Sequence, residues 1–443
     1  MQNQGIRDAR SLGTPKLLVL GLQHMFAMFG ATVLVPALTG LSVSATLLFA
    51  GLGTLFFHVL TKGKVPAFLG SSFAYLAGYA AIAPNGEAAL LPYACVGVAA
   101  SGLLYLILAA LVRGFGANRV MRFFPPVVTG PIIICIGMTL ANSAINNCTG
   151  SWDIALVAIL TVVIFNIWGK GMLRIIPILL GVLVSYVYAA VTGRVDFSGV
   201  ASAAWIGLPV KMENTVFSLV GNCDMNLLVT AIIAIMPIAF ATMIEHIGDI
   251  CAISSTVGAN FIADPGLHRT LLGDGLATSI ASLFGAPANT PSGENTGVLA
   301  LTRVYDPLVI RLAAVYAIIA SFCPKFAALV SAMPTGTIGG VSLILYGMIS
   351  AIGVRNLVEN RVDLAKSRNV IVVSLIISLA LGITFSAAGA ITFHVGEFTL
   401  NFSGLAVAAI VGIVVNAILP GKDYNFQNDY EYGKTTEDHG QML

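Results

Sequence analysis

The chain has 443 residues, of which 57% are hydrophobic and 9% charged, with a formal net charge of +2 and a mean hydropathy of +0.91. This composition excludes an ordinary soluble domain and indicates a polytopic membrane protein. The Lys and Arg residues form no basic face, so we expect no nucleic-acid partner. The six cysteines show no C-x-x-C pairing and are interpreted as small core residues.

Several familiar motifs are missing from the sequence. Residues 1–16 carry charge but no short apolar stretch with a cleavage site, so we expect a retained first helix and no cleaved signal peptide. There is no P-loop, G-x-S-x-G or H-E-x-x-H motif, so we expect neither an ATP-driven pump nor an enzyme such as an intramembrane metalloprotease. No metal site is expected, because no histidine pair has the i, i+4 spacing of a helical ligand pair.

Hydropathy predicts about fourteen membrane segments, each near the roughly 20 residues that a bilayer core requires. Their extents are 17–40, 43–61, 65–83, 88–112, 123–146, 153–169, 173–192, 225–253, 268–285, 286–303, 307–331, 334–354, 369–390 and 402–420. With the N-terminus inside, nineteen of the 22 Lys and Arg residues fall on the inner side and only Arg194, Lys211 and Lys325 outside. This bias predicts cytoplasmic termini, with residues 434–443 as a disordered acidic tail.

Two of these segments are interrupted by polar and helix-breaking residues. Residues 63–79 read GKVPAFLGSSFAYLAGY, and residues 285–303 read GAPANTPSGENTGVLALTR. Non-helical backbone at membrane depth is tolerated only where protein or a wet cavity satisfies its N–H and C=O groups. We therefore predict that the two segments cross, pair as short extended strands and continue into half-helices. The N-termini of these half-helices would present free N–H donors to a polar pocket.

The spacing of polar residues indicates an internal repeat. The separation from His24 to Ser72 equals that from His246 to Glu294, 48 residues in each case. A polar-histidine pair followed by a broken segment, once in each half, predicts a repeat of about seven spans. An odd number of spans gives the two copies opposite orientations, an arrangement that puts a substrate site near the bilayer midplane.

Four carboxylates fall within the predicted segments: Glu245, Asp249, Asp274 and Glu294. For Asp274, near the predicted inner start of its helix, we favour helix capping or loop pairing. Glu245 and Asp249 are four residues apart and share one helix face. Ionisable groups in the membrane cost roughly 2.5 kcal/mol or more each and are functional by default. With no Lys or Arg predicted near them, they would bind a proton, a cation or substrate donors, and burial favours the proton.

The histidines have structural alternatives. For His24, an interhelix hydrogen bond without substrate contact and a place in the substrate cavity both stay open. Position 246 is turned about 100° from Glu245 on a helix, so we favour packing over ligation for His246. For Thr290, Ser292 and Asn295, a role limited to satisfying the broken backbone also stays open.

Several motifs resemble those of one transporter family. The string ENTGVLALTR at residues 294–303 fits the signature of the nucleobase–ascorbate transporter family, also called nucleobase:cation symporter-2. The strings QH in the first segment, GSSFAY in the third, EHIGD in the eighth and GGVSLILYG in the twelfth also match. The resemblance covers essentially the whole chain and is strongest to the members that carry uracil.

This resemblance implies an all-α fold of fourteen membrane segments in two inverted seven-helix repeats, residues 1–200 and 201–443. Segments 1–4 and 8–11 would form a core domain, and segments 5–7 and 12–14 a gate domain. Elevator-like movement of core against gate would alternate access to the site. The resemblance also implies a homodimer through gate helices, located in the cytoplasmic (inner) membrane.

The resemblance also assigns roles to individual residues. Glu245 and Glu294 would bind the base, and the backbone at Phe73 and Gly293 would donate to its carbonyls. The substrate-binding set is completed by Ser72 beside the crossing and by two residues of the gate helix, Ser342 and Tyr346.

Proton coupling is assigned less sharply. Asp249 takes a position that is His in one well-known member and acidic in others, so direct contact, water-mediated contact and proton relay all stay open. Asp249, His24 and Glu245 are the candidates for proton coupling.

Uracil presents N–H donors and C=O acceptors along one edge, which suit carboxylates and half-helix amides. Glu294 favours uracil, because purine-type relatives tend to have Gln there. We therefore expect a proton-coupled symporter that imports uracil by alternating access, with no cofactor beyond the coupling proton. A symporter of xanthine or another purine, an anion exchanger, a channel and a non-transporting nucleobase receptor are the alternatives. The two glutamates oppose the anion exchanger.

Overall fold

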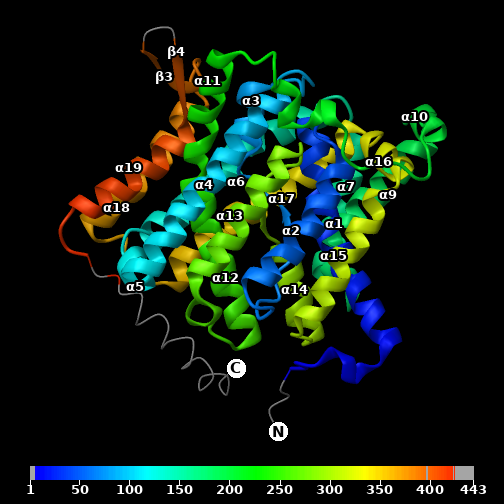
Figure 1. Ribbon diagram of the computed structural model, residues 1–443, viewed down its shortest axis with the longest axis horizontal. Helices are drawn as coiled ribbons and strands as arrows, with labels where there is room; N and C mark the ends of the chain where they lie inside the picture. Colours follow the sequence, from blue (N-terminus) through cyan, green and yellow to red (C-terminus); the bar gives the residue numbers. More distant parts are fainter. Residues whose placement is uncertain (1–4, 396–397, 423, 425–443) are drawn as a thin grey trace.

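The computed structural model describes residues 5–395, 398–422 and 424, and the predicted tail at 434–443 lies outside these residues. The molecule is a bundle of helices with two small pairs of strands (Figure 1). The first half contains α1 (Thr14–Thr39), α2 (Val43–Leu60), β1 (Leu69–Ser71), α3 (Leu76–Ile82), α4 (Leu91–Phe115), α5 (Ala117–Met121), α6 (Pro126–Cys148), α7 (Trp152–Trp168), α8 (Met172–Ile175), α9 (Pro177–Val191) and α10 (Ser198–Ser202).

The second half places three strands among its helices. It contains α11 (Met225–Ile235), α12 (Ala239–Val257), α13 (Leu267–Leu283), β2 (Asn289–Pro291), α14 (Gly293–Thr302), α15 (Pro307–Ser321), α16 (Pro324–Ser331), α17 (Thr335–Glu359), α18 (Ser367–Thr384), β3 (Ala390–Val395), β4 (Phe398–Ser403) and α19 (Gly404–Ile418). Strand β1 pairs with β2, and β3 pairs with β4, both antiparallel.

Seven helical stretches in the described part of the chain are long and apolar enough to cross a membrane. They are α1, α2, α4, α6, the continuous stretch Met225–Val257, α17 and α18. The pair α15 and α16 would add an eighth, but it bends by 88°. Helices α7, α9 and α19 are apolar but shorter. The chain is thus a multi-pass membrane protein, although helix length alone does not reproduce the predicted fourteen segments.

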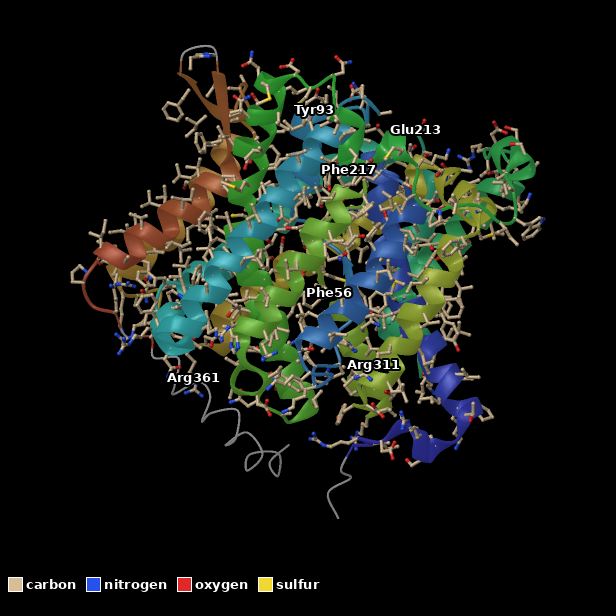
Figure 2. The ribbon with its side chains drawn as sticks, in the orientation of Figure 1. Phe56, Tyr93, Glu213, Phe217, Arg311 and Arg361 are labelled. Carbon is tan, nitrogen blue, oxygen red and sulfur yellow. The ribbon has the colours of Figure 1, made fainter. Side chains whose placement is uncertain are left out.

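Charged residues lie at both ends of the bundle. Arg311 and Arg361 are at one end of the bundle, and Glu213 is at the other (Figure 2). Lys325, one of the three bases expected on the outer side, donates from Nζ to the carbonyl of Val200 at 2.8 Å. That carbonyl belongs to α10, which lies far from the end that carries Arg311 (Figure 1).

Two features of the fold differ from the sequence-based expectations. Strands β3 and β4 form a hairpin between α18 and α19, where only a connection was expected. Asp274 was expected to cap a helix or pair a loop, and this was wrong. It lies well inside α13 with a fully buried side chain, because α13 already begins at Leu267.

The long helices pack closely because small residues line their contacts. A Cβ placed on Gly137 of α6 would lie 2.2 Å from the carbonyl oxygen of Tyr346 on α17. A Cβ on Gly102 of α4 would lie 2.5 Å from that of Gly275 on α13. Small residues at such crossings let backbones approach where apolar burial between helices gives no driving force. Helix α13 also contacts β2, so one of these crossings involves a helix that packs against the broken segments.

Candidate functional site

The two interrupted segments pair as short strands, as the sequence predicted. Leu69 is paired with Pro291, Gly70 with Thr290 and Ser71 with Asn289. The ladder continues on both sides, because Ser72 N donates to Ala288 O at 2.9 Å and Ser292 N donates to Phe68 O at 2.8 Å. The polar backbone of each break therefore finds its partners in the other break.

Threonine side chains on neighbouring helices brace the crossing. Thr54 Oγ1 of α2 accepts from Leu69 N at 2.8 Å. Thr278 Oγ1 of α13 accepts from Asn289 N at 3.1 Å and donates to Asn289 O at 3.2 Å. The sequence analysis missed both threonines. Their only signal was a hydroxyl in the middle of an otherwise apolar helix.

Helix α14 starts directly after β2 and presents Gly293 and Glu294 in its first turn. Ser292 Oγ donates to Glu294 Oε2 at 2.9 Å, which fixes one carboxylate oxygen. Gly293 is exposed, and a Cβ placed on it would meet no atom within 4 Å. A carboxylate in the first turn of a helix is favoured by the helix dipole. The start of α14 therefore borders open space with an acceptor beside free N–H groups.

Helix α12 brings two more carboxylates to this region. Glu245 and Asp249 are both half-buried, and Glu245 Oε2 has no hydrogen-bond partner among the described residues. Helices α12 and α14 pack against each other, and Asp249 is close enough to interact electrostatically with both Glu245 and Glu294. Across residues 5–395, 398–422 and 424, these three acids have no ion pair with Lys or Arg. The expected set of unpaired acids is thus present.

His24 lies against α14 from α1. Asn295 Nδ2 donates to His24 O at 2.9 Å and lies 3.2 Å from His24 Nδ1, while His24 Nε2 has no partner within the described chain. The interhelix hydrogen bond that the sequence left open is therefore present. It joins the polar pair of the first helix to the signature segment.

Helix α17 contributes Ser342 and Tyr346, which are both buried. Their hydroxyl groups have no hydrogen-bond partner within the part of the chain that the structure describes. The ring of Tyr346 packs edge-on against Phe73, with 6.0 Å between centroids. Tyr346 also lines a cavity of about 360 Å³ together with α3, Thr139 and Ser143. The ring pair thus joins the crossing region to α17 beside a cavity.

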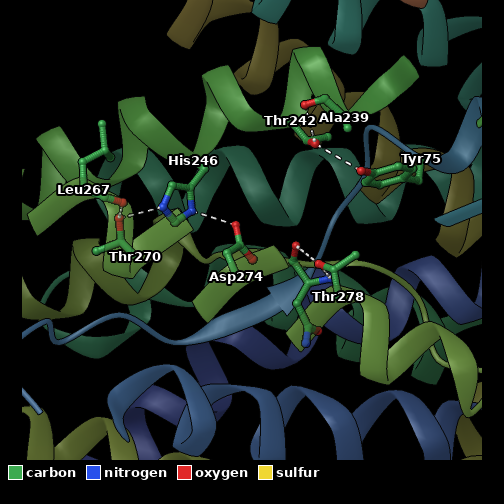
Figure 3. A network of polar contacts seen from close by, with 9 residues as sticks. Tyr75, Ala239, Thr242, His246, Leu267, Thr270, Asp274 and Thr278 are labelled. Carbon is green, nitrogen blue, oxygen red and sulfur yellow. Dashed lines mark hydrogen bonds and ion pairs between the residues drawn. The ribbon is translucent and has the colours of Figure 1, made fainter. Parts of the chain in front are cut away.

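A second polar group lies between α12 and α13 (Figure 3). His246 Nδ1 is 2.7 Å from Asp274 Oδ2, and His246 Nε2 is 3.1 Å from Thr270 Oγ1. Tyr75 and Thr242 approach each other nearby, with 3.2 Å between their hydroxyl oxygens. The packing role predicted for His246 agrees with these contacts, whereas its partnership with Asp274 was not foreseen. Within the described residues, no group of three or more His, Cys, Asp or Glu side chains could hold a metal ion.

The sequence is similar to proteins named as permeases. The model described as the permease family, Xan_ur_permease, matches residues 15–389. The uracil permease of Bacillus caldolyticus is 41% identical over 437 residues, which cover 96% of each chain. The uracil permease of Bacillus subtilis (strain 168) is 39% identical over 453 residues, covering 99% of this chain and 98% of the relative. That of Escherichia coli (strain K12) is 37% identical and covers 90% of each.

The fold is similar to solved transporter structures of low sequence identity. The transmembrane domain of the cyanobacterial bicarbonate transporter BicA matches with a TM-score of 0.60 at 13% identity, over 94% of this chain and all of that one. SLC26A9 matches with a TM-score of 0.64 at 12% identity, over 93% of this chain and 66% of that one. The structural likeness shows the fold, and the sequence matches show the family. The chain therefore belongs to the nucleobase–ascorbate transporter family of permeases, and is a transporter, not an enzyme.

Proposed function

We propose that the chain is a proton-coupled symporter that imports uracil by alternating access. Relatives that are 41% and 39% identical are named uracil permeases and match over nearly the whole chain. The observation that carries the proposal is the meeting of Glu294, at the free start of α14, with Glu245 on α12 beside the paired strands. This arrangement combines acceptors and backbone donors in one small region of the membrane interior.

The proposed binding mode follows from the chemistry of the base. Glu245 and Glu294 accept from the N–H groups of uracil, since ionised carboxylates are strong acceptors. The N–H groups of Gly293 and Phe73 donate to its carbonyl oxygens. Gly293 lies in the first turn of α14, where N–H groups have no intrahelical acceptor. Ser72 holds the strand that presents Phe73, and Ser342 and Tyr346 close the site from α17.

Proton coupling is proposed for Asp249, with His24 and Glu245 as the other candidates. Three neighbouring acids without a cationic partner repel one another when ionised, so at least one of them holds a proton near neutral pH. If Glu245 must be ionised to accept from uracil, Asp249 is the better carrier of the proton that travels with it. His24 is held by Asn295, which leaves only its Nε2 free to exchange a proton.

The proposal includes the architecture expected for the family. Residues 1–200 and 201–443 would be two inverted repeats that together supply fourteen segments. Segments 1–4 and 8–11 would form the core, and segments 5–7 and 12–14 the gate. Elevator movement of the core past the gate would alternate access, in a homodimer built through gate helices. The chain would reside in the cytoplasmic membrane with both termini inside.

The test is uptake of labelled uracil into proteoliposomes with and without an imposed inward proton gradient. We expect accumulation above the outside concentration only with the gradient. Unlabelled xanthine and unlabelled uracil are added as competitors in parallel samples. Strong competition by xanthine with weak competition by uracil would assign the site to purines instead. Saturable uracil binding without uptake in either condition would indicate a receptor and contradict the transporter proposal.

A further inference from the structure

The strongest feature outside the proposed substrate site is the contact between His246 and Asp274. Both side chains are 0% exposed. Figure 3 shows the imidazole between Asp274 on one side and Thr270 on the other. His246 follows Glu245 directly and is therefore turned about 100° from it on the helix. The pair thus forms a separate polar site on a different face of α12.

The contacts of His246 and Asp274 restrict the protonation states that the pair can adopt. Thr270 Oγ1 lies 3.0 Å from the carbonyl oxygen of Leu267, which can only accept, so we place the single hydroxyl hydrogen there. The Thr270 oxygen then accepts from His246 Nε2–H. The 2.7 Å contact between His246 Nδ1 and Asp274 Oδ2 also needs a hydrogen, because two lone pairs at that distance repel. Two forms of the pair supply a hydrogen to both contacts. In one, His246 is an imidazolium and Asp274 a carboxylate, and in the other, His246 is neutral and Asp274 is a carboxylic acid.

The surrounding charges also favour one additional proton on this pair. The titratable groups that face the pair are Glu245 and Asp249 on α12, Tyr105 on α4 and Tyr75 just before α3. Within the described residues, neither Lys nor Arg forms an ion pair with Asp274, and its Oδ1 has no hydrogen-bond partner. A pair with a net negative charge would be a buried, uncompensated ion next to further acids, which is strongly unfavourable. One additional proton makes the pair neutral.

We propose that His246 and Asp274 share one resident proton, distinct from the proton that drives uptake. The neutral pair ties α12 to α13 and so fixes the helix that carries Glu245 and Asp249. Both side chains are fully buried and both ring nitrogens have partners, so the shared proton has no contact with water in this structure. The contacts and neighbouring charges of the pair are the same whichever substrate the protein carries.

The test is ¹⁵N nuclear magnetic resonance of the histidine-labelled full-length protein in lipid bilayers. The resonances of His246 are identified by their loss in His246→Gln. We expect Nε2 to stay protonated between about pH 5 and 8, the range in which an ordinary histidine titrates, and to stay unchanged when uracil is added.

Two outcomes of this measurement overturn the proposal. An Nε2 without hydrogen, paired with a protonated Nδ1, would mean that Thr270 donates and that the pair is negatively charged. A His246 resonance that titrates in this range, or that changes when uracil binds, would mean that the proton is not resident.

A second measurement uses Asp274→Asn, whose amide can donate to His246 Nδ1 and leave Nε2–H in place. We expect the ratio of protons to uracil molecules transported by this variant to equal that of the wild type, whatever the rate. A lower ratio would identify Asp274 as part of the coupling path and contradict the resident proton. If the variant does not transport, the spectra of the wild type and of His246→Gln still decide the question.

Discussion

The two crossing segments have the same backbone plan but different surroundings. Strand β1 is followed by Ser72 and Phe73, both buried, and α3 starts only at Leu76. Strand β2 is followed almost at once by α14, with Gly293 exposed and Glu294 in its first turn. The first segment therefore offers backbone and packing, whereas the second adds a carboxylate at an open helix start. Two paired breaks thus offer different chemical groups to the proposed site.

The difference follows from what covers each helix start. Phe73 packs against Tyr346 of α17, so the first crossing is closed by the helix that we assign to the gate. No atom lies within 4 Å of a Cβ placed on Gly293, so the second crossing stays open there. Four predictions test this contrast, and they are taken from the largest expected effect to the smallest.

Glu294→Gln is expected to weaken uracil binding about 10- to 100-fold, which corresponds to about 1.5–3 kcal/mol for a hydrogen bond to a charged group. The amide keeps one acceptor and adds a donor that opposes a donor on the base. Equilibrium binding of labelled uracil to purified protein measures the effect. Glu213→Gln, at an exposed glutamate at the end of the bundle opposite Arg311, is the matched control. Unchanged affinity in Glu294→Gln would remove Glu294 from the site.

Ser72→Pro is expected to weaken binding about tenfold, because proline removes the N–H that donates to Ala288 O and leaves this carbonyl unpaired. Phe73→Ala should cost less, since the proposed contact at this position uses the backbone. Binding to both variants is compared with their thermal unfolding midpoints to separate site effects from misfolding. If Phe73→Ala abolished uracil binding while Ser72→Pro left it unchanged, the proposed role of the first crossing would be refuted.

Asp249→Asn is expected to change uracil binding by less than about tenfold and to keep counterflow exchange, because the amide resembles a protonated acid. Accumulation driven by a pH gradient should be lost. Both activities are measured in liposomes at matched protein density. Accumulation equal to that of the wild type would exclude Asp249 as the coupling acid, and Glu245 or Glu294 would become the leading candidate.

Thr54→Val and Thr278→Val compare the braces of the two crossings. Thr54 makes one hydrogen bond to the first strand, whereas Thr278 makes two to the second. Each lost bond should cost about 1 kcal/mol of unfolding free energy, so Thr278→Val should lower the thermal midpoint more. Thr192→Val, at an exposed helix end, is the control. Equal effects of the first two variants would show that the crossings are braced alike.

Much of this structure can be predicted from sequence because the bilayer restricts the backbone structures that a chain can adopt. Long apolar runs must become helices, and the two runs broken by Pro, Gly and Ser had to satisfy their backbone inside protein, which predicts the pairing of β1 with β2. The distribution of Lys and Arg predicts an inner side for Arg311 and an outer side for Lys325. Acids without a nearby base mark Glu245, Asp249 and Glu294 before any coordinates are known.

The tertiary structure decided which polar groups meet, because those partners are far apart in the chain. The local sequence GDG favours a helix cap at Asp274, yet its side chain contacts His246, 28 residues away. His24 has no local partner, but Asn295 reaches it from the other half of the chain. Thr54 and Thr278 look like ordinary helix residues until strands lie against them. Hydropathy and spacing report the environment of one segment, whereas a hydrogen bond requires two segments to be placed within about 3 Å of each other.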